Sequence, residues 1–156
     1  MTVITRFIIA CALVSFAAGC AITAESTGKI DPTSVSFIEP KDIKWIPNSA
    51  GTAEQAVLYG DPAKPGLYII RYKWKAGNMS RPHSHPNDRL IVVLSGIWWV
   101  GTGEVFDPNS TVPMRAGTYV THYGKKIHYD GAKDEDAIIE VHGIGPATST
   151  PAERKP

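Results

Sequence analysis

The chain has 156 residues, with 16 Lys and Arg against 15 Asp and Glu, a formal net charge of +1. This balance, without a basic cluster, gives no electrostatic footprint for nucleic acid or an anionic membrane surface and favours a small-molecule partner. The only cysteines, Cys11 and Cys20, lie near the N-terminus. The remaining chain therefore excludes a disulfide scaffold, a thiolate metal site and a cysteine nucleophile.

The N-terminus predicts an export signal over residues 1–24. A single charged residue, Arg6, precedes an apolar run from Phe7 to Ala18, which is too short to span a bilayer core of roughly 30 Å. Two cleavage sites stay open. One resembles a bacterial lipobox and would leave a lipidated Cys20, the only membrane attachment expected, whereas the other precedes Glu25 and suits an ordinary signal peptidase. We expect a periplasmic protein or an outer-membrane lipoprotein.

Three further regions follow along the chain. Residues 25–54 predict an arm with short strands, in which the extended pieces 37–40 and 43–47 each stop at a proline that cannot donate to a ladder. Residues 55–143 predict one barrel domain. Residues 144–156 are rich in Thr, Pro and charge, a composition that predicts a disordered tail.

The predicted barrel consists of short strands separated by Gly and Pro. The clearest covers 67–75, where Tyr68, Ile70, Tyr72 and Trp74 alternate with basic residues and place an aromatic face toward a core. No window shows a convincing helical period. The other expected strands are 56–60, 89–95, 97–100, 112–115, 118–123, 127–130 and 137–142. This spacing predicts an all-β sandwich or barrel.

Residues 77–96 contain the pattern with the most chemistry. His83 and His85 are one residue apart, so they share one side of a strand but could not share a helical face. Imidazole is the commonest metal ligand in proteins, and this pair therefore predicts half of a metal site. A second turn-and-strand stretch, 117–131, brings in His128.

These two stretches resemble the paired motifs of the cupin superfamily, G-x5-H-x-H-x3/4-E-x6-G and G-x5-P-x-G-x2-H-x3-N. The matching positions are Gly77, His83, His85 and Gly96 in the first motif, and Gly117 and His128 in the second. Four positions depart: Arg89 stands for Glu, Tyr123 for Pro, Lys125 for Gly and Ala132 for Asn. The resemblance covers roughly residues 55–143 and implies a double-stranded β-helix, or jelly-roll, barrel of the RmlC-like type.

The resemblance also implies that His83, His85 and His128 hold one divalent metal ion. Three neutral imidazoles leave the opposite coordination positions open for water, substrate or dioxygen. Similarity to three-histidine dioxygenases favours Fe(II), while Zn, Mn, Ni and Cu remain alternatives because imidazole suits them all. The other interpretation is that these rings only hydrogen-bond within a metal-free barrel.

Arg89 is the most informative departure. Strand alternation points it to the same side as His85 unless a bulge intervenes. In one interpretation it is a catalytic-site residue that binds a substrate carboxylate or enolate. In the other it forms an ion pair with Asp88, Asp130 or Glu140, since an unpaired buried charge is costly.

Other side chains are weaker candidates. His122 is either a catalytic proton shuttle beside the site or a packed histidine. Asp130 either orients a ligand imidazole or belongs to an ordinary turn. We expect three aromatic residues to line the apolar wall of the pocket: Tyr72, Trp74 and Trp99. Trp98, on the opposite face from Trp99, is a candidate contact for a homodimer.

Three functions remain open at this point. The first is a dioxygenase-like enzyme with Fe(II) at three histidines and an anionic, chelating substrate at Arg89. The second is a non-redox lyase, isomerase or hydrolase that uses the metal as a Lewis acid. The third is a binding module that captures a small molecule without catalysis.

Overall fold

The computed structural model describes residues 28–49 and 51–155. The export signal predicted over 1–24 and the lipid attachment at Cys20 lie outside the described residues and stay predictions. Across the part of the chain that the structure describes, no helix combines the length and apolar character needed to cross a membrane.

The chain divides into two units, Met1–Ser36 and Phe37–Pro156. In the described part of the first unit, the Asp31 carboxylate accepts hydrogen bonds from the backbone and hydroxyl of Thr33 at 2.9 and 2.7 Å. Such an Asx-type turn is a local arrangement that needs no packed core. All of the strands that the structure describes lie in the second unit.

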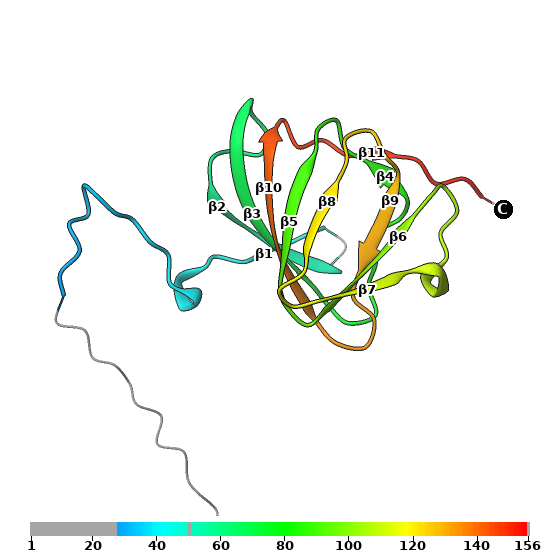
Figure 1. The fold of residues 1–156 in the computed structure, drawn as a ribbon, viewed down its shortest axis with the longest axis horizontal. Coiled ribbons are helices and arrows are strands. Elements are labelled where there is room, and N and C mark those ends of the chain that lie inside the picture. The colour runs from blue at the N-terminus through cyan, green and yellow to red at the C-terminus, as the bar shows by residue number, and fades with distance from the viewer. Residues whose placement is uncertain (1–27, 50, 156) are drawn as a thin grey trace, which may run out of the picture. The chain divides into compact units, whose positions relative to one another are not determined.

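Two antiparallel sheets form the second unit (Figure 1). The larger has the strand order β1-β2-β3-β10-β5-β8 and the smaller β11-β4-β9-β6-β7. The strands are β1 (Ile46–Pro47), β2 (Ala53–Tyr59), β3 (Gly66–Trp74), β4 (His83–Ser84), β5 (Arg89–Ser95), β6 (Ile97–Thr102), β7 (Val112–Arg115), β8 (Tyr119–His122), β9 (His128–Gly131), β10 (Ala137–Gly145) and β11 (Thr150–Pro151). Two short 3-10 turns, η1 (Pro40–Asp42) and η2 (Pro108–Ser110), complete the elements. The predicted all-β jelly-roll is confirmed.

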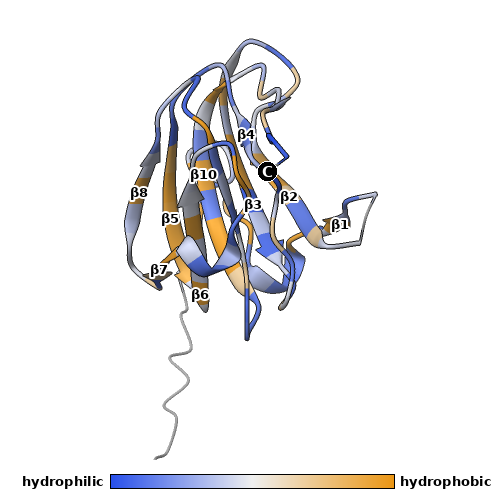
Figure 2. Cartoon of the chain, turned by 90° about the vertical axis from the view of Figure 1, so that its right-hand side faces the viewer, coloured by the Kyte–Doolittle hydropathy of each residue, from blue (hydrophilic) through white to orange (hydrophobic). Residues whose placement is uncertain are grey.

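The core lies between the sheets and follows the alternation expected of half-buried strands. Tyr68 and Ile70 on β3 are 1% and 2% exposed, whereas Leu67 on the same strand is exposed. Figure 2 shows hydrophobic stretches along β5 and β10, which are neighbours in the larger sheet. The buried cluster is Tyr68, Ile70, Ile91, Val93, Trp98, Val100, Ala132, Ala137, Ile139 and Val141. Each large apolar side chain buried in this way stabilises the fold by about 1.5–3 kcal/mol.

The expected faces of two tryptophans are reversed. Trp98 is buried in the core at 1% exposure, and Trp99 points outward, with the Lys133 Nζ 3.9 Å from its ring centroid. The prediction of Trp98 as a dimer contact and Trp99 as a pocket residue is therefore wrong. Side chains along a strand always alternate between its two faces, but the preceding turn decides which set faces the core. A shift of one residue exchanges the two faces. Here β6 follows Gly96, which has a left-handed φ of 69°.

The predicted disordered tail covered 144–156, and its described residues, 144–155, instead follow the barrel wall. β10 extends into it, and β11 pairs antiparallel with β4. The backbone N–H of Ala152 donates to the carbonyl of Pro82 at 2.9 Å, and the Arg81 guanidinium pairs with the Glu153 carboxylate. Composition alone missed this because the short strand β4 offers a free edge only in the folded barrel.

The predicted arm, 25–54, also differs in detail. β2 begins at Ala53, inside the arm, and β1 is the only strand in its described residues outside β2. The extended piece expected to end at Pro40 is followed by η1, because proline is well suited to the first position of a helical turn.

Candidate metal centre

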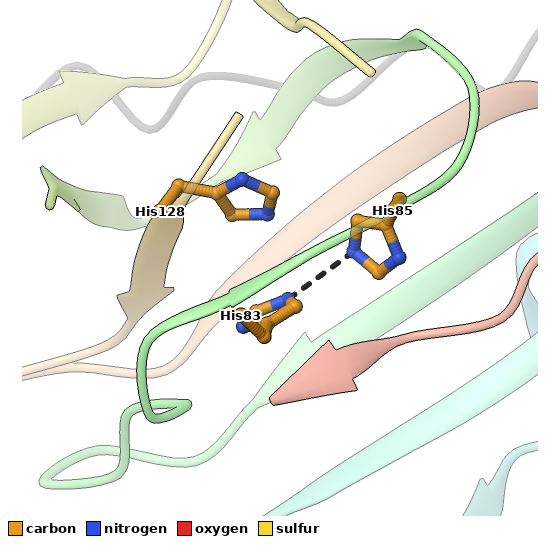
Figure 3. A group of neighbouring side chains, drawn as sticks. All are labelled: His83, His85 and His128. Atoms are coloured by element: carbon orange, nitrogen blue, oxygen red, sulfur yellow. Dashed lines mark hydrogen bonds between the residues drawn. The ribbon is translucent and has the colours of Figure 1, made fainter. Parts of the chain in front are cut away.

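His83 and His128 lie opposite each other on neighbouring strands. They are register partners in the antiparallel pair of β4 and β9. His85 follows β4 directly, and its ring centroid lies 4.8 Å from that of His83. One ring nitrogen from each of the three histidines lies within 4.8 Å of the other two, and Figure 3 shows the rings around a common space. The structure thus brings together the three histidines that the sequence singled out.

Each of these rings is oriented by a backbone carbonyl that accepts a hydrogen bond from Nδ1. The carbonyls are those of Arg81 for His83 at 2.7 Å, Thr148 for His85 at 2.8 Å and Lys126 for His128 at 3.1 Å. A carbonyl oxygen only accepts, so Nδ1 carries the hydrogen and Nε2 of the neutral ring presents a lone pair. Metal-ligating histidines in proteins are held in the same way.

The Nε2 atoms of His83 and His85 lie only 3.2 Å apart, the contact dashed in Figure 3. In the neutral rings both atoms are acceptors, because both Nδ1 atoms already carry the hydrogen. Two lone pairs at this distance repel unless a proton, an N–H group or a metal cation lies between them. The arrangement therefore favours a cation at this point.

Burial keeps two of the rings, those of His85 and His128, in the neutral form that a metal requires. Loss of hydration lowers the pKa of His85 to about 4, and the nearby Arg89 charge lowers it further. Burial, followed by the neighbouring His83 and His85, lowers the pKa of His128 to about 3. At neutral pH these two imidazoles are therefore unprotonated.

Arg89 points into the barrel and contacts His85. The Arg89 Nη1 donates to His85 Nε2 across 2.6 Å, and the arginine is 9% exposed. Its guanidinium carbon lies 5.7 Å from the Tyr72 ring centroid. The Arg89 Nε is buried and has no hydrogen-bond partner among the described residues. One N–H group of the guanidinium thus contacts His85, a candidate metal ligand. Another, at Nε, is left for a bound small molecule.

The ion-pair interpretation of Arg89 does not match these contacts. The Glu140 carboxylate pairs with Arg71 at 2.8 Å, and Asp88 accepts a backbone N–H at 2.7 Å. Asp130 lines the same cavity as Arg89, yet its nearest ion-pair distance among the described residues is 4.0 Å, to a histidine. Arg89 therefore carries its charge into the site without a carboxylate partner in the described chain.

His122 and Asp130 are both buried next to His128. The His122 ring centroid lies 3.8 Å from that of His128, and burial, followed by His128, lowers the pKa of His122 to about 2. Asp130 accepts a hydrogen bond from the indole N–H of Trp98 at 3.3 Å, and burial raises the pKa of its carboxyl. His122 is thus packed, as one interpretation held, but it is packed inside the histidine cluster.

A cavity of about 370 Å³ opens onto this cluster. Its polar wall contains His83, His85, His122, Arg89 and Asp130, and its apolar wall contains Tyr72, Trp74, Ile91, Trp98, Ile139 and Val141. Tyr72 and Trp74 occupy the wall as expected. The volume suits a small organic molecule, and a mainly apolar wall with a few convergent polar groups is typical of a ligand site.

Sequence reasoning missed the contribution of the C-terminal segment. Thr148 supplies the carbonyl that orients His85, and Ser149 and Pro151 line the cavity. A backbone carbonyl leaves no signature in a side-chain pattern, so no motif could have identified Thr148. The pairing of β11 with β4 is what brings this segment to the site.

Comparison with known proteins identifies the architecture. No protein-family model and no curated protein matches this sequence. Among solved structures, the polyketide cyclase RemF from Streptomyces resistomycificus is similar with a TM-score of 0.63 and 13% identity, covering 78% of this chain and 87% of that one. A conserved protein with a double-stranded β-helix domain from Klebsiella pneumoniae gives 0.60 and 16%, covering 81% and 99%. An RmlC-like cupin from Ralstonia eutropha gives 0.56 and 18%, covering 70% and 68%.

The chain has the cupin fold. At these identities the likeness concerns the fold and not the reaction. The cupin fold also explains one departure from the second motif. Lys125 stands where the motif has glycine and adopts a left-handed φ of 61°, a conformation that glycine reaches without cost. The turn that delivers His128 is therefore kept although its usual residue is not.

The side chains present in this cupin barrel fit a divalent metal ion. The Nε2 of His128 is buried and has no hydrogen-bond partner among the described residues. The 3.2 Å between Nε2 of His83 and of His85 agrees with the roughly 3.0–3.4 Å expected for two ligands whose metal–nitrogen bonds are about 2.0–2.1 Å. An ion bound by all three rings requires Arg89 to leave the His85 nitrogen that it now contacts.

The lowered histidine pKa values predict that the metal-free protein loses stability in mild acid. The unfolded chain protonates its histidines near pH 6.5, whereas folded His85, His128 and His122 stay neutral down to about 4, 3 and 2. Between pH 6 and pH 4 the unfolded state therefore binds more protons, and the free energy of unfolding falls as pH falls. We expect a slope steeper than the ~1.4 kcal/mol per pH unit of one histidine, measured by urea unfolding with a chelator present. His122→Gln should reduce the slope by about 1.4 kcal/mol per pH unit, the contribution of one proton. An unchanged slope would contradict this account.

The carbonyl of Thr148 predicts that the C-terminal segment supports metal binding. Ending the chain at Ala147, which packs against the core, removes the acceptor of the His85 Nδ1 hydrogen bond and the β11 pairing. Loss of such an orienting partner typically costs 10–100-fold in metal affinity, and we expect that loss for Zn(II) by isothermal titration calorimetry. Glu135→Gln, at an exposed loop position, is the matched control and should bind Zn(II) normally. Full affinity in the shortened chain would show that the segment has no such role.

Proposed function

We propose that this protein is a metal-dependent enzyme that acts on a small, anionic and chelating organic substrate, with Arg89 as the substrate anchor. The observation that supports this most directly is the state of Arg89. Its guanidinium lies in the cavity wall, has no carboxylate within ion-pair distance among the described residues, and keeps a buried Nε without a partner. A buried unpaired charge is costly, and a substrate carboxylate or enolate would satisfy it with short, charge-assisted hydrogen bonds.

The ligand set supports the choice of an anionic substrate. A divalent ion held by His83, His85 and His128 would keep its full +2 charge, act as a Lewis acid and leave coordination positions open. The carbonyls that bind the three Nδ1 atoms hold the rings in their ligand tautomer. Tyr72 and Trp74 form part of the apolar wall that keeps water from the substrate. An α-hydroxy acid, enolate or β-dicarbonyl combines the negative charge and the chelating geometry that this site requires.

The working form we favour is a dioxygenase-like enzyme with Fe(II), because three neutral histidines leave room for both a bidentate substrate and dioxygen. The Nε2 of His122 is buried without a hydrogen-bond partner among the described residues. Because burial lowers the pKa of this ring to about 2, it would accept a hydrogen bond from the substrate and stay neutral. A non-redox reaction with Zn(II) is the second candidate. It is favoured by the predicted export of the chain, since sites assembled outside the cytosol meet Zn(II) and Cu(II), which bind imidazole more tightly than Fe(II).

Arg89→Ala should keep metal binding and lose affinity for small acids. Removal of the positive charge beside His85 frees a ligand nitrogen, whereas the substrate loses a charge-assisted contact whose truncation typically costs about 2–5 kcal/mol, roughly 30-fold or more in Kd. Lactate and acetylacetone are suitable probes for calorimetry on the Zn(II)-loaded protein. Arg71→Ala, which removes an arginine paired with Glu140, is the control. Equal lactate binding by both variants would contradict the anchoring role.

Oxygen consumption separates the two candidate reactions. Apo protein reloaded with Fe(II) should consume oxygen with at least one α-hydroxy acid, β-dicarbonyl or phenolic acid from a panel, measured with an oxygen electrode. Turnover by Zn(II)-loaded protein without oxygen would select the non-redox reaction. Tight binding of a panel member with no product by mass spectrometry in either form would leave only a binding protein and would overturn the proposed enzyme.

A further inference from the structure

Three buried side chains form a second cluster that overlaps the predicted ligands. His122 ends β8, and His128 and Asp130 lie one residue apart on β9, the same spacing as His83 and His85. The three are 7%, 4% and 6% exposed, respectively. One ligand atom of each lies within 4.8 Å of the other two. Strand alternation directs both β9 side chains toward the interior, where β8 contributes its histidine from the other sheet.

The polar atoms of this cluster are not satisfied by the protein. The Nε2 atoms of His122 and His128 are both buried and without a hydrogen-bond partner among the described residues. Burying one such atom unsatisfied costs about 1–3 kcal/mol. Asp130 uses Oδ1 to accept from Trp98, while its Oδ2 faces His128 Nε2 at 4.0 Å. Two imidazole nitrogens and one carboxylate oxygen are thus directed at the same small region.

The second cluster and the three-histidine set share one atom. His128 binds the Lys126 carbonyl through Nδ1 at 3.1 Å, so only its Nε2 can ligate, and the two sets cannot each hold an ion through it at once. In the present arrangement Arg89 donates to His85 Nε2 at 2.6 Å. The three-histidine set therefore has one ligand nitrogen already engaged. In the second set, the Nε2 atoms of His122 and His128 have no hydrogen-bond partner among the described residues, and Asp130 accepts from Trp98 through Oδ1.

We propose that a divalent cation rests in a second, more deeply buried position, held by His122, His128 and Asp130, while Arg89 contacts His85. An anionic ligand that draws Arg89 away from His85 then allows the ion to bind the three histidines. This inference rests on the proposed function in that both positions serve the same ion. It assigns to Asp130 the carboxylate ligand that the first motif lacks at Arg89.

The charges of the site support this assignment. A site of three neutral imidazoles beside the Arg89 guanidinium places a divalent cation next to a positive charge, without a negative ligand. The second position instead includes a buried carboxylate, which a cation neutralises. Two histidines and one carboxylate are a ligand set that suits Fe(II), Mn(II) and Zn(II) and leaves further coordination positions open. Arg89 contacts His85 and is the register partner of His122 across β5 and β8. A movement of Arg89 would therefore change the surroundings of both metal positions.

Ligand variants of the full-length protein test the two positions with Co(II), whose visible spectrum reports on its ligands. His83→Ala with His85→Ala should still bind one Co(II) per chain with nearly unchanged affinity. His122→Gln with Asp130→Asn should weaken Co(II) at least about tenfold, and His128→Ala, which removes the shared ligand, at least about 100-fold. His142→Gln, whose ring pairs with Glu140, is the matched control and should bind as the natural chain does. Far-UV circular dichroism verifies the fold of each variant.

The outcomes separate this inference from the proposed function. Loss of Co(II) from the His83 and His85 variant, with full retention by the His122 and Asp130 variant, would overturn the second position and leave the three-histidine enzyme intact. Loss from both double variants would also overturn it, because a single site would then use all of these ligands. A natural chain that binds no Co(II) would remove both proposals.

Histidine NMR on the unaltered protein gives a test that does not depend on the folding of variants. With 15N-labelled histidine and one equivalent of Zn(II), the Nε2 resonances of His122 and His128 should shift, and that of His85 should stay. Addition of lactate should then shift His85. A Zn(II)-induced shift at His83 and His85 without one at His122 would show that the ion rests at the three histidines from the start.

Discussion

The site depends on the convergence of imidazole lone pairs inside a closed β-shell. Backbone carbonyls fix the hydrogen on Nδ1 of three rings, and burial keeps two of them neutral by lowering their pKa values. Their Nε2 atoms are then acceptors in a space that only a cation, an N–H group or a proton can fill. Arg89 occupies part of that space by donating to His85. The proposed metal binding follows from this excess of acceptors.

Replacement of the usual motif carboxylate by Arg89 changes the charge of the whole cavity. Where the motif has a glutamate, this barrel has the Arg89 guanidinium. A buried carboxylate, Asp130, lines the same cavity and lies with its Oδ2 4.0 Å from His128 Nε2. The guanidinium favours anionic ligands, and the carboxylate favours cations. The cavity between them is bounded by aromatic and aliphatic side chains, which strengthen both interactions because they exclude water.

Much of the fold could be predicted from local patterns. The alternation of Tyr68, Ile70, Tyr72 and Trp74 identified β3 and its inward face, and Gly and Pro marked most strand ends. Two predictions were wrong, the faces of the two tryptophans and the disorder of the C-terminal segment. Both depend on structure that the local sequence pattern does not contain. Whether Trp98 or Trp99 faces the core depends on the turn at Gly96, and the order of the C-terminal segment depends on the free edge of β4 in the assembled barrel.

The sequence by itself determined most of the strands, the cupin-type motifs and the identity of the candidate ligands, because spacing along a strand decides which side chains share a face. Only the tertiary structure decided that Arg89 contacts His85 rather than a carboxylate, that Thr148 orients a ligand ring, and that His122 and Asp130 join His128. These contacts connect strands from different parts of the chain and from both sheets. Their distances follow from how the two sheets close around the core, which no local periodicity encodes.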